Sequence, residues 1–413
     1  MGDMIVLDEK RQKNDKLLLL LTIIIVFITD SLFFAINIQS SVQLFKRTSV
    51  IALAVLMFVY HIVIRKRLVN IHILLITVSA LLSSFLAGYL FNGYYYYTFI
   101  ACGWIGYIYS RYYSIEDFSS AFCKIMRVVA VLSFIVFLVG GSLADSGIFP
   151  IITSSKGNQY AFLGFTNIPM TLHHRTRNYG PFWEPGTYQI YLNIALYLAL
   201  FVEKKNNKVI DSIIFVGTGL STRSGIVLIP MLLILAAYTF ERRNIKTFVA
   251  ILALIVGIYI IIWLGLFDRA LAKITNEDGT NSLIYRWIGL VGGLQGFLRN
   301  PLFGSPPSVN DDLKMQLAQL YLGSNYSSAV NTFANLLGYF GAYIGGYFLV
   351  SSYKVFSSVN RQKMSAVIAF IAFVLATSNE NMTTSLFFIV FCFLRSNKQR
   401  NEDNTQKVVN RGA

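Results

Sequence analysis

Apolar runs long enough to cross a lipid bilayer recur along almost the whole of this sequence, and basic residues mark many of their ends. A transmembrane helix needs about 20 predominantly apolar residues, which is the length of most of these runs. Because 55% of the residues are hydrophobic and only 13% are charged, the chain is far more apolar than a soluble domain. We therefore predict an all-α polytopic membrane protein with about twelve transmembrane helices. The expected spans are 17–36, 49–64, 71–91, 94–110, 124–141, 187–202, 209–221, 225–240, 247–266, 327–350, 364–378 and 382–395.

The basic residues predict the orientation of these spans. Clusters at 65–67, 204–208 and 242–246 fall on alternate short loops, on the same side as the chain ends. Cytoplasmic loops carry the excess of Lys and Arg, so both ends are expected to be cytoplasmic. The expected organisation is a cytoplasmic tail at 1–16, one transmembrane domain at 17–395 and a second cytoplasmic tail at 396–413.

This orientation places two long loops, 142–186 and 267–326, together on the extracytoplasmic side, where structured loops commonly carry a binding or catalytic site. Lys46 and Arg47 are also assigned to that side, while the short loops as a whole alternate as the rule requires. The net charge of +15 thus reflects orientation in the membrane. Its clusters are too short and scattered for a nucleic-acid surface.

The end of the first long loop, 173–186, contains two arginines, two histidines and a glutamate between apolar runs. Its prolines and glycines predict a structured loop, since Pro cannot continue a helix and Gly allows unusual dihedral angles. Glu184 stands directly before an apolar helix, where a carboxylate serves either as a general base or as a partner of the helix N-terminus. His173 and His174 either titrate near neutral pH or lie solvated in the loop.

Arg223 lies at the tip of a short hairpin. The segment 209–240 must cross the membrane twice with fewer than the roughly 40 residues that two full passes need. The tip, 221–225, is therefore expected to lie below the outer surface. An arginine there either faces an anion-holding cavity or extends its side chain to the interface.

Arginines outnumber carboxylates near the expected helix ends on the extracytoplasmic side. This set comprises Arg175, Arg177, Arg223 and Arg286, with Glu184 as the nearby acid. If these arginines converge in the fold, they predict an anionic ligand. A diphosphate fits, because guanidinium groups form bidentate, charge-assisted hydrogen bonds to phosphate and stay protonated in a partly dry site.

Other polar groups have simpler interpretations. The acidic pairs Glu277–Asp278 and Asp311–Asp312 lie in polar segments without further ligands at suitable spacing, which favours solvated charge over a metal site. Asp30 and Glu380 stand within or between apolar runs, where each either lines a cavity or pairs with an arginine. The sequence contains no nucleotide-binding or zinc motif, so no cofactor is expected.

Four segments resemble a known family. The stretch 177–186, Arg-Asn-Tyr-Gly-Pro-Phe-Trp-Glu-Pro-Gly, resembles the Arg…Gly-x-Phe-x-Glu-Pro loop of bacterial O-antigen and capsule polymerases of the Wzy type. The segment 221–225 is similar to their Ser-Arg-Ser-Gly turn. The segments 285–287 and 300–304 resemble the Arg…Pro-Leu-x-Gly pattern that these polymerases share with O-antigen ligases. Val330 occupies the position of a histidine in the ligases, which weakens the ligase interpretation and leaves the catalytic base unassigned.

The resemblance implies a membrane glycosyltransferase of the GT-C class in the bacterial inner membrane, with an active site facing the periplasm. The implied reaction transfers a growing glycan from undecaprenyl diphosphate to a hydroxyl of an incoming undecaprenyl-diphosphate-linked repeat unit. It needs no metal if arginines neutralise the leaving diphosphate. Membrane lipids and a chain-length regulator protein are further implied partners, and nucleic acid is not one. The implied catalytic residues are Arg177, Glu184, Arg223 and Arg286, and the implied substrate-binding residues are His173, His174, Arg175, Trp183 and Tyr285.

Two alternatives stay open. An O-antigen ligase would transfer the glycan to a lipid A-core acceptor. A lipid-linked oligosaccharide transporter would show internal repeat symmetry and charged residues near the bilayer midplane. The sequence has no evident repeat, and its ionisable groups cluster toward one side.

Overall fold

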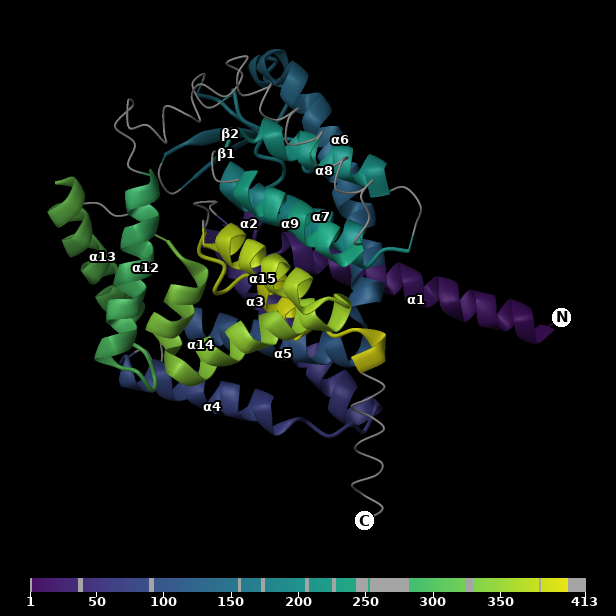
Figure 1. Cartoon of the computed structure of the whole chain (residues 1–413), viewed down its shortest axis with the longest axis horizontal. Helices are drawn as coiled ribbons and strands as arrows, with labels where there is room; N and C mark the ends of the chain where they lie inside the picture. The colour runs from purple at the N-terminus through teal and green to yellow at the C-terminus, as the bar shows by residue number, and fades with distance from the viewer. Residues whose placement is uncertain are drawn as a thin grey trace.

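The structure, a computed structural model, is mostly helical (Figure 1). It describes residues 2–35, 40–88, 93–154, 157–171, 175–204, 208–224, 228–242, 252, 282–323, 330–378 and 380–399, and every structural statement below refers to these. The helices are α1 (Gly2–Phe27), α2 (Leu32–Ala35), α3 (Ser40–Val59), the π-helix η1 (Tyr60–Ile64), α4 (Ile71–Leu86), α5 (Tyr94–Tyr112), α6 (Ile115–Asp145), α7 (Pro185–Phe201), α8 (Lys208–Ser221), α9 (Leu228–Arg242), α12 (Ser282–Arg299), α13 (Pro307–Leu322), α14 (Thr332–Val359), α15 (Lys363–Thr377) and α16 (Leu386–Phe393).

Three of the described helical stretches are long and apolar enough to cross a membrane. They are Ser40–Ile64, Ile115–Gly140 and Thr332–Val359. Large apolar side chains point outward from this set, for example Leu56 and Leu138, which are 68% and 67% exposed. Soluble proteins rarely expose a continuous apolar surface, whereas lipid tails cover one. The expectation of a mostly helical membrane protein is thus confirmed.

Helices occupy most of the predicted spans, but among the described helices only the three named above are long and apolar enough to cross a membrane. The predicted span 247–266 lies outside the described residues, apart from the single helical residue Leu252. α1 begins at Gly2, inside the predicted N-terminal tail, and its first half projects away from the other helices (Figure 1).

Polar residues begin several of the helices at the ends of apolar runs. Ser114 and Asp117 form a capping box at the start of α6, in which the Asp117 N–H donates to Ser114 Oγ at 3.2 Å. Asn70, Asn331 and Ser385 accept from backbone N–H groups at the starts of α4, α14 and α16. Such caps satisfy amide groups that would otherwise lack partners at a helix start.

The first long loop contains a small folded layer. A three-stranded antiparallel sheet of order β1-β2-β3 lies beside α6 and α8 (Figure 1). Beneath it Ile152, Tyr160 and Tyr179 pack with Leu32 in a separate apolar cluster. The all-α expectation therefore holds apart from this sheet. The strands are β1 (Ile151–Thr153), β2 (Gln159–Phe162) and β3 (Asn167–Pro169).

The second predicted loop, 267–326, contains the helices α12 and α13, and residues 267–281 lie outside the described part. α12 packs against α14 with very little space between them. A β-carbon on Gly289 would lie 2.7 Å from the Val330 carbonyl oxygen, and one on Gly293 would lie 2.8 Å from Ala334. Glycines therefore allow the two backbones to approach each other.

α6 connects the two ends of the helical bundle. The end that carries the sheet and the start of α7 at Pro185 is called the sheet end below. At the other end, called the basic end, the Ile115 N–H donates to the Arg395 carbonyl at 3.0 Å, and the basic cluster 65–67 lies beside Arg111. α16 lies between the sheet end and the basic end, and all of its residues are buried.

Candidate functional site

The first long loop docks on the tip of the hairpin formed by α8 and α9. The Asn178 N–H donates to the Ser221 carbonyl at 3.0 Å, and the Asn178 side-chain amide donates to Ser221 Oγ at 3.0 Å. Arg177 Nε donates to the Thr222 carbonyl at 3.2 Å. Two of the segments that resemble polymerase motifs are therefore in direct contact.

Arg223 comes directly after Thr222 in the sequence, and its own backbone is strained. Its φ of 47° lies in the left-handed region, which costs residues other than glycine about 1–2 kcal/mol. Its N–H donates to the Leu220 carbonyl at 3.1 Å. Thr222 is fully buried and Ser224 is 9% exposed, so the described part of the tip lies inside the protein. Arg177 thus donates to the carbonyl of the residue that precedes Arg223.

Glu184 is the N-cap residue of α7. Its backbone is extended, its side chain makes no capping hydrogen bond, and it is exposed. Pro185 follows as the first helical residue, a position where its missing N–H costs nothing. The Glu184 carboxylate therefore does not cap the helix through a hydrogen bond. Trp183 is half-buried and packs against both the main core and the cluster beneath the sheet.

Arg286 lies near the start of α12, within range of three other charges. Burial lowers the pKa of its guanidinium, whereas the Glu380 and Glu184 carboxylates raise it and Arg177 lowers it further. The Glu380 carboxylate lies beside Gly186, two residues after Glu184, and Arg177 belongs to the same loop as Glu184. We call Arg177, Glu184, Arg286 and Glu380 the four-charge cluster.

Tyr179 supports the same arrangement from the loop. Burial raises its pKa to about 12, with the Arg177 charge opposing that shift and the Glu184 charge adding to it. The loop residues of the four-charge cluster are thus close to each other as well as to α12.

Glu380 is held in this cluster from two sides. Thr332 Oγ1 lies 2.6 Å from the Glu380 carbonyl and accepts from the Met382 N–H at 3.0 Å. The side chain is buried, and Oε1 lies 2.5 Å from the place of a β-carbon on Gly186. The carboxylate thus sits against the first turn of α7, where a helix dipole favours negative charge.

The sequence indicated that Glu380 has a specific role, but it did not show where the residue lies in the fold. Its position in Ser-Asn-Glu-Asn between two apolar runs indicated a group that lines a cavity or pairs with an arginine. The structure puts it in electrostatic range of Arg286. No pattern in the sequence links these two distant residues.

Arg175 has a different partner. Its two terminal nitrogens donate to the Asp145 carboxylate at 2.9 and 2.8 Å, and it also donates to the Pro169 and Met170 carbonyls. These hydrogen bonds lower the pKa of Asp145. Arg175 therefore ties the end of α6 to β3. His173 and His174 lie outside the described residues.

Tyr285 also serves packing. It is half-buried and packs with Ile284 against Ile288 and Ala318, in the apolar cluster between α12 and α13. Its neighbour Arg286 belongs to the four-charge cluster, so adjacent residues have different surroundings.

The segment 300–304 forms a joint between α12 and a kink in α14. The Ala342 N–H donates to the Pro301 carbonyl at 2.7 Å, and the Ser305 N–H donates to the Gly338 carbonyl at 2.6 Å. At the kink, Gly341 has a φ of 77°. A β-carbon there would lie 2.2 Å from the Leu302 carbonyl oxygen. This segment therefore positions α12, and with it Arg286.

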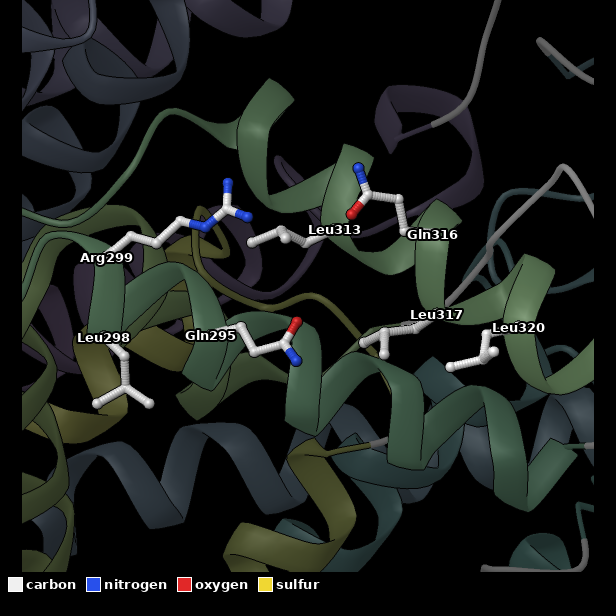
Figure 2. A pocket seen from close by; sticks show the side chains of 7 residues that line it. All are labelled: Gln295, Leu298, Arg299, Leu313, Gln316, Leu317 and Leu320. Atoms are coloured by element: carbon white, nitrogen blue, oxygen red, sulfur yellow. The ribbon is translucent and has the colours of Figure 1, made fainter.

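A groove of about 490 Å³ lies between α12 and α13 (Figure 2). Figure 2 shows side chains of both helices around it, and none of the four charged residues is among them. The charges rather than this groove therefore define the candidate site. The lining residues are Gln295, Leu298, Arg299, Leu313, Gln316, Leu317 and Leu320.

Within the described ranges, no three His, Cys, Asp or Glu side chains come together to hold a metal ion. Asp311 instead accepts from Lys314 at 3.4 Å, and the lysine also donates to Asn335 at 3.0 Å. Burial lowers the pKa of this lysine. The second acidic pair, 277–278, lies outside the described residues.

Comparison of the chain with family models, with curated proteins and with solved structures finds no match. A family assignment thus has only the quoted sequence segments behind it.

Proposed function

We propose that this chain is a polysaccharide polymerase of the bacterial inner membrane, a membrane glycosyltransferase with GT-C-type architecture and a periplasmic active site. It would transfer a growing glycan from one undecaprenyl diphosphate to a hydroxyl of a second carrier-linked repeat unit. The observation that carries the proposal is the four-charge cluster, which gathers side chains from a loop, from α12 and from the turn before α16 at one end of an apolar helical bundle.

The arginines suit the leaving group of this reaction. When the bond between the anomeric carbon and the diphosphate oxygen breaks, the electron pair stays on the oxygen and the diphosphate gains negative charge. The charge of Arg177 acts on that of Arg286, and Arg223 follows the residue whose carbonyl Arg177 contacts. Each well-placed donor to such a developing charge contributes about 3–4 kcal/mol to catalysis.

The two carboxylates suit different tasks because their surroundings differ. Glu184 is exposed and makes no capping hydrogen bond, so it can accept the proton that the acceptor hydroxyl loses as the new glycosidic bond forms. Glu380 is buried against Gly186 and acts electrostatically on Arg286. It therefore orients the guanidinium and does not receive the proton.

The outward apolar faces of the helices suit the substrates. Undecaprenyl chains are long hydrocarbons, and residues such as Leu56 and Leu138 offer them a lipid-like surface. The diphosphate head and the sugars would lie at the sheet end. A chain-length regulator protein remains a proposed partner.

The test uses a host from which the gene is deleted. An Arg286→Ala variant, expressed at the normal level, should leave surface glycan of a single repeat unit where the wild type makes a ladder of long chains. Arg299→Ala is the matched control, because Arg299 lies on the same helix, is exposed and stands outside the cluster. Full ladders from the Arg286 variant would contradict the proposal. Loss of all attached glycan would indicate a ligase instead.

A further inference from the structure

Two basic residues at the sheet end lie outside the four-charge cluster. Lys46 and Arg47 are half-buried on the first half of α3. Gln43 donates to the Phe34 carbonyl at 3.2 Å, which ties this half of α3 to α2. The Leu32 N–H in turn donates to the Pro181 carbonyl at 2.8 Å, which ties α2 to the first long loop. The two cations therefore share the end of the molecule that carries the candidate site.

Lys46 lies near a buried carboxylate. Asp30 is 4% exposed and acts electrostatically on Lys46. Its Oδ2 accepts from the Tyr191 hydroxyl of α7 at 2.5 Å and from the Ser385 hydroxyl at the start of α16. The charge of Lys46 is thus influenced by a buried carboxylate that Tyr191 and Ser385 hold in place.

Arg47 lies beside an aromatic ring at the lipid-facing surface. Its guanidinium carbon is 3.8 Å from the centre of the Tyr94 ring, and Tyr94 is 56% exposed. Leu44 and Phe45 on the same turn of α3 are 61% and 60% exposed. The helix therefore presents two cations next to an apolar outward face, which fits a lipid with an anionic head.

The charge balance favours an anion here. The Asp30 carboxylate offsets the charge of Lys46 but not that of Arg47. The Arg47 guanidinium contacts a neutral ring. The trend of basic residues toward the cytoplasm leaves this pair unexplained. Arginine and lysine at headgroup depth attract phosphate groups of lipids.

The proposed reaction needs two different diphosphate sites. The donor carrier loses its glycan, so its diphosphate gains charge and requires the arginines of the four-charge cluster. The acceptor carrier keeps its glycan and its diphosphate keeps its charge. It needs only to be held where its sugars reach the donor.

The turn before α16 connects the surroundings of the two basic groups. Glu380 belongs to the four-charge cluster, while Ser385 contacts Asp30 and Thr383 contacts the Tyr95 hydroxyl beside Tyr94. Five residues of chain, which span at most about 18 Å, lead from Glu380 to the residue that contacts Asp30. The oligosaccharide of the acceptor would extend along this turn toward the reacting centre.

We infer that Lys46 and Arg47 hold the diphosphate of the acceptor carrier, in a site distinct from the four-charge cluster. The inference rests on the proposed function. It assigns α3 a role in substrate binding and makes the lipid-facing surface at Leu44 and Phe45 the place where the acceptor's hydrocarbon chain lies.

The test measures how many molecules of undecaprenyl diphosphate the purified full chain binds in zwitterionic nanodiscs, by native mass spectrometry. The wild type should bind two. A Lys46→Gln, Arg47→Gln variant should bind one, and an Arg286→Gln variant should also bind one. Arg65→Gln with Arg67→Gln is the control at the basic end and should still bind two.

The outcomes separate this inference from the function. Two carriers on the Lys46 and Arg47 variant would overturn the inference and leave the polymerase intact. No carrier on the wild type would overturn both. Equal displacement by phosphatidylglycerol would show a general anionic-lipid surface and would also overturn the inference. Arg47→Gln alone leaves Lys46 with Asp30, so it should weaken the second binding event even if the double variant does not fold.

Discussion

The Glu380 carboxylate occupies the space next to Gly186 that a side chain would need, with Oε1 2.5 Å from the place of the missing β-carbon. The contact joins the turn before α16 to the first turn of α7. The Glu380 charge also acts on Arg286, where it raises the pKa of the guanidinium against the lowering caused by burial.

Gly186→Ala should separate activity from stability. The new methyl group meets the far end of a flexible side chain, so the free energy of unfolding should change by less than about 1 kcal/mol. The displaced carboxylate no longer orients Arg286, and a misplacement of this kind costs about a hundredfold in rate. Glycan ladders and thermal unfolding in detergent measure the two effects. Gly217→Ala, which meets nothing within 4 Å, is the control and should leave ladders unchanged.

Arg286→Lys should make the activity depend on pH. Burial lowers the pKa of a cation at this position, and lysine titrates at a lower pH than arginine. The variant therefore keeps its charge in acid and loses it as pH rises, while the wild type stays protonated. The ratio of variant to wild-type transfer by purified protein should fall between about pH 6 and about pH 9. A constant ratio over that range would show that the charge at residue 286 is not required.

Arg223→Gly should be more stable than Arg223→Ala and equally inactive. Glycine relieves the strain at φ 47°, which is worth about 1 kcal/mol, but neither variant has a guanidinium. Lys66 offers a matched position at the basic end, because its φ is 48°. Lys66→Gly should gain similar stability over Lys66→Ala and keep full ladders. An active Arg223→Gly variant would remove Arg223 from the catalytic set.

Gly341→Ala should destabilise the fold more than Gly323→Ala. Both glycines have positive φ, 77° and 62°, but a β-carbon on Gly341 meets the Leu302 carbonyl while one on Gly323 meets nothing within 4 Å. Gly323→Ala should therefore cost about 1–2 kcal/mol. Gly341→Ala should add about 1–3 kcal/mol of overpacking. Equal unfolding temperatures for the two variants would contradict the tight joint between 300–304 and α14.

The apolar runs predicted the helical character because lipid imposes a single simple requirement on length and composition. The helices within 267–326 were not predicted, because the prediction considered only segments that meet this requirement. α12 and α13 do not meet the length and hydropathy of a span. In the structure Gly289 and Gly293 allow close contact with α14.

The candidate site was only partly visible in the sequence. Local motifs pointed to Arg177, Glu184, Arg223 and Arg286, because arginines without nearby acids indicate an anion. The role of Glu380 depends on a contact with Gly186 across the fold, which no local pattern records. Arg175 lies two residues before Arg177, so the sequence pointed to both. In the structure Arg175 pairs with Asp145, whereas Arg177 contacts the Thr222 carbonyl.

The central helix α16 adds a contribution that comes from the backbone. Its eight residues are all buried, so water cannot screen its dipole as it would at a surface. Its N-terminus, which carries roughly half a positive charge, faces Ser385 and Asp30 at the sheet end. The backbone at the start of α16 therefore adds a positive partial charge beside the Asp30 carboxylate, in addition to the charges of the side chains.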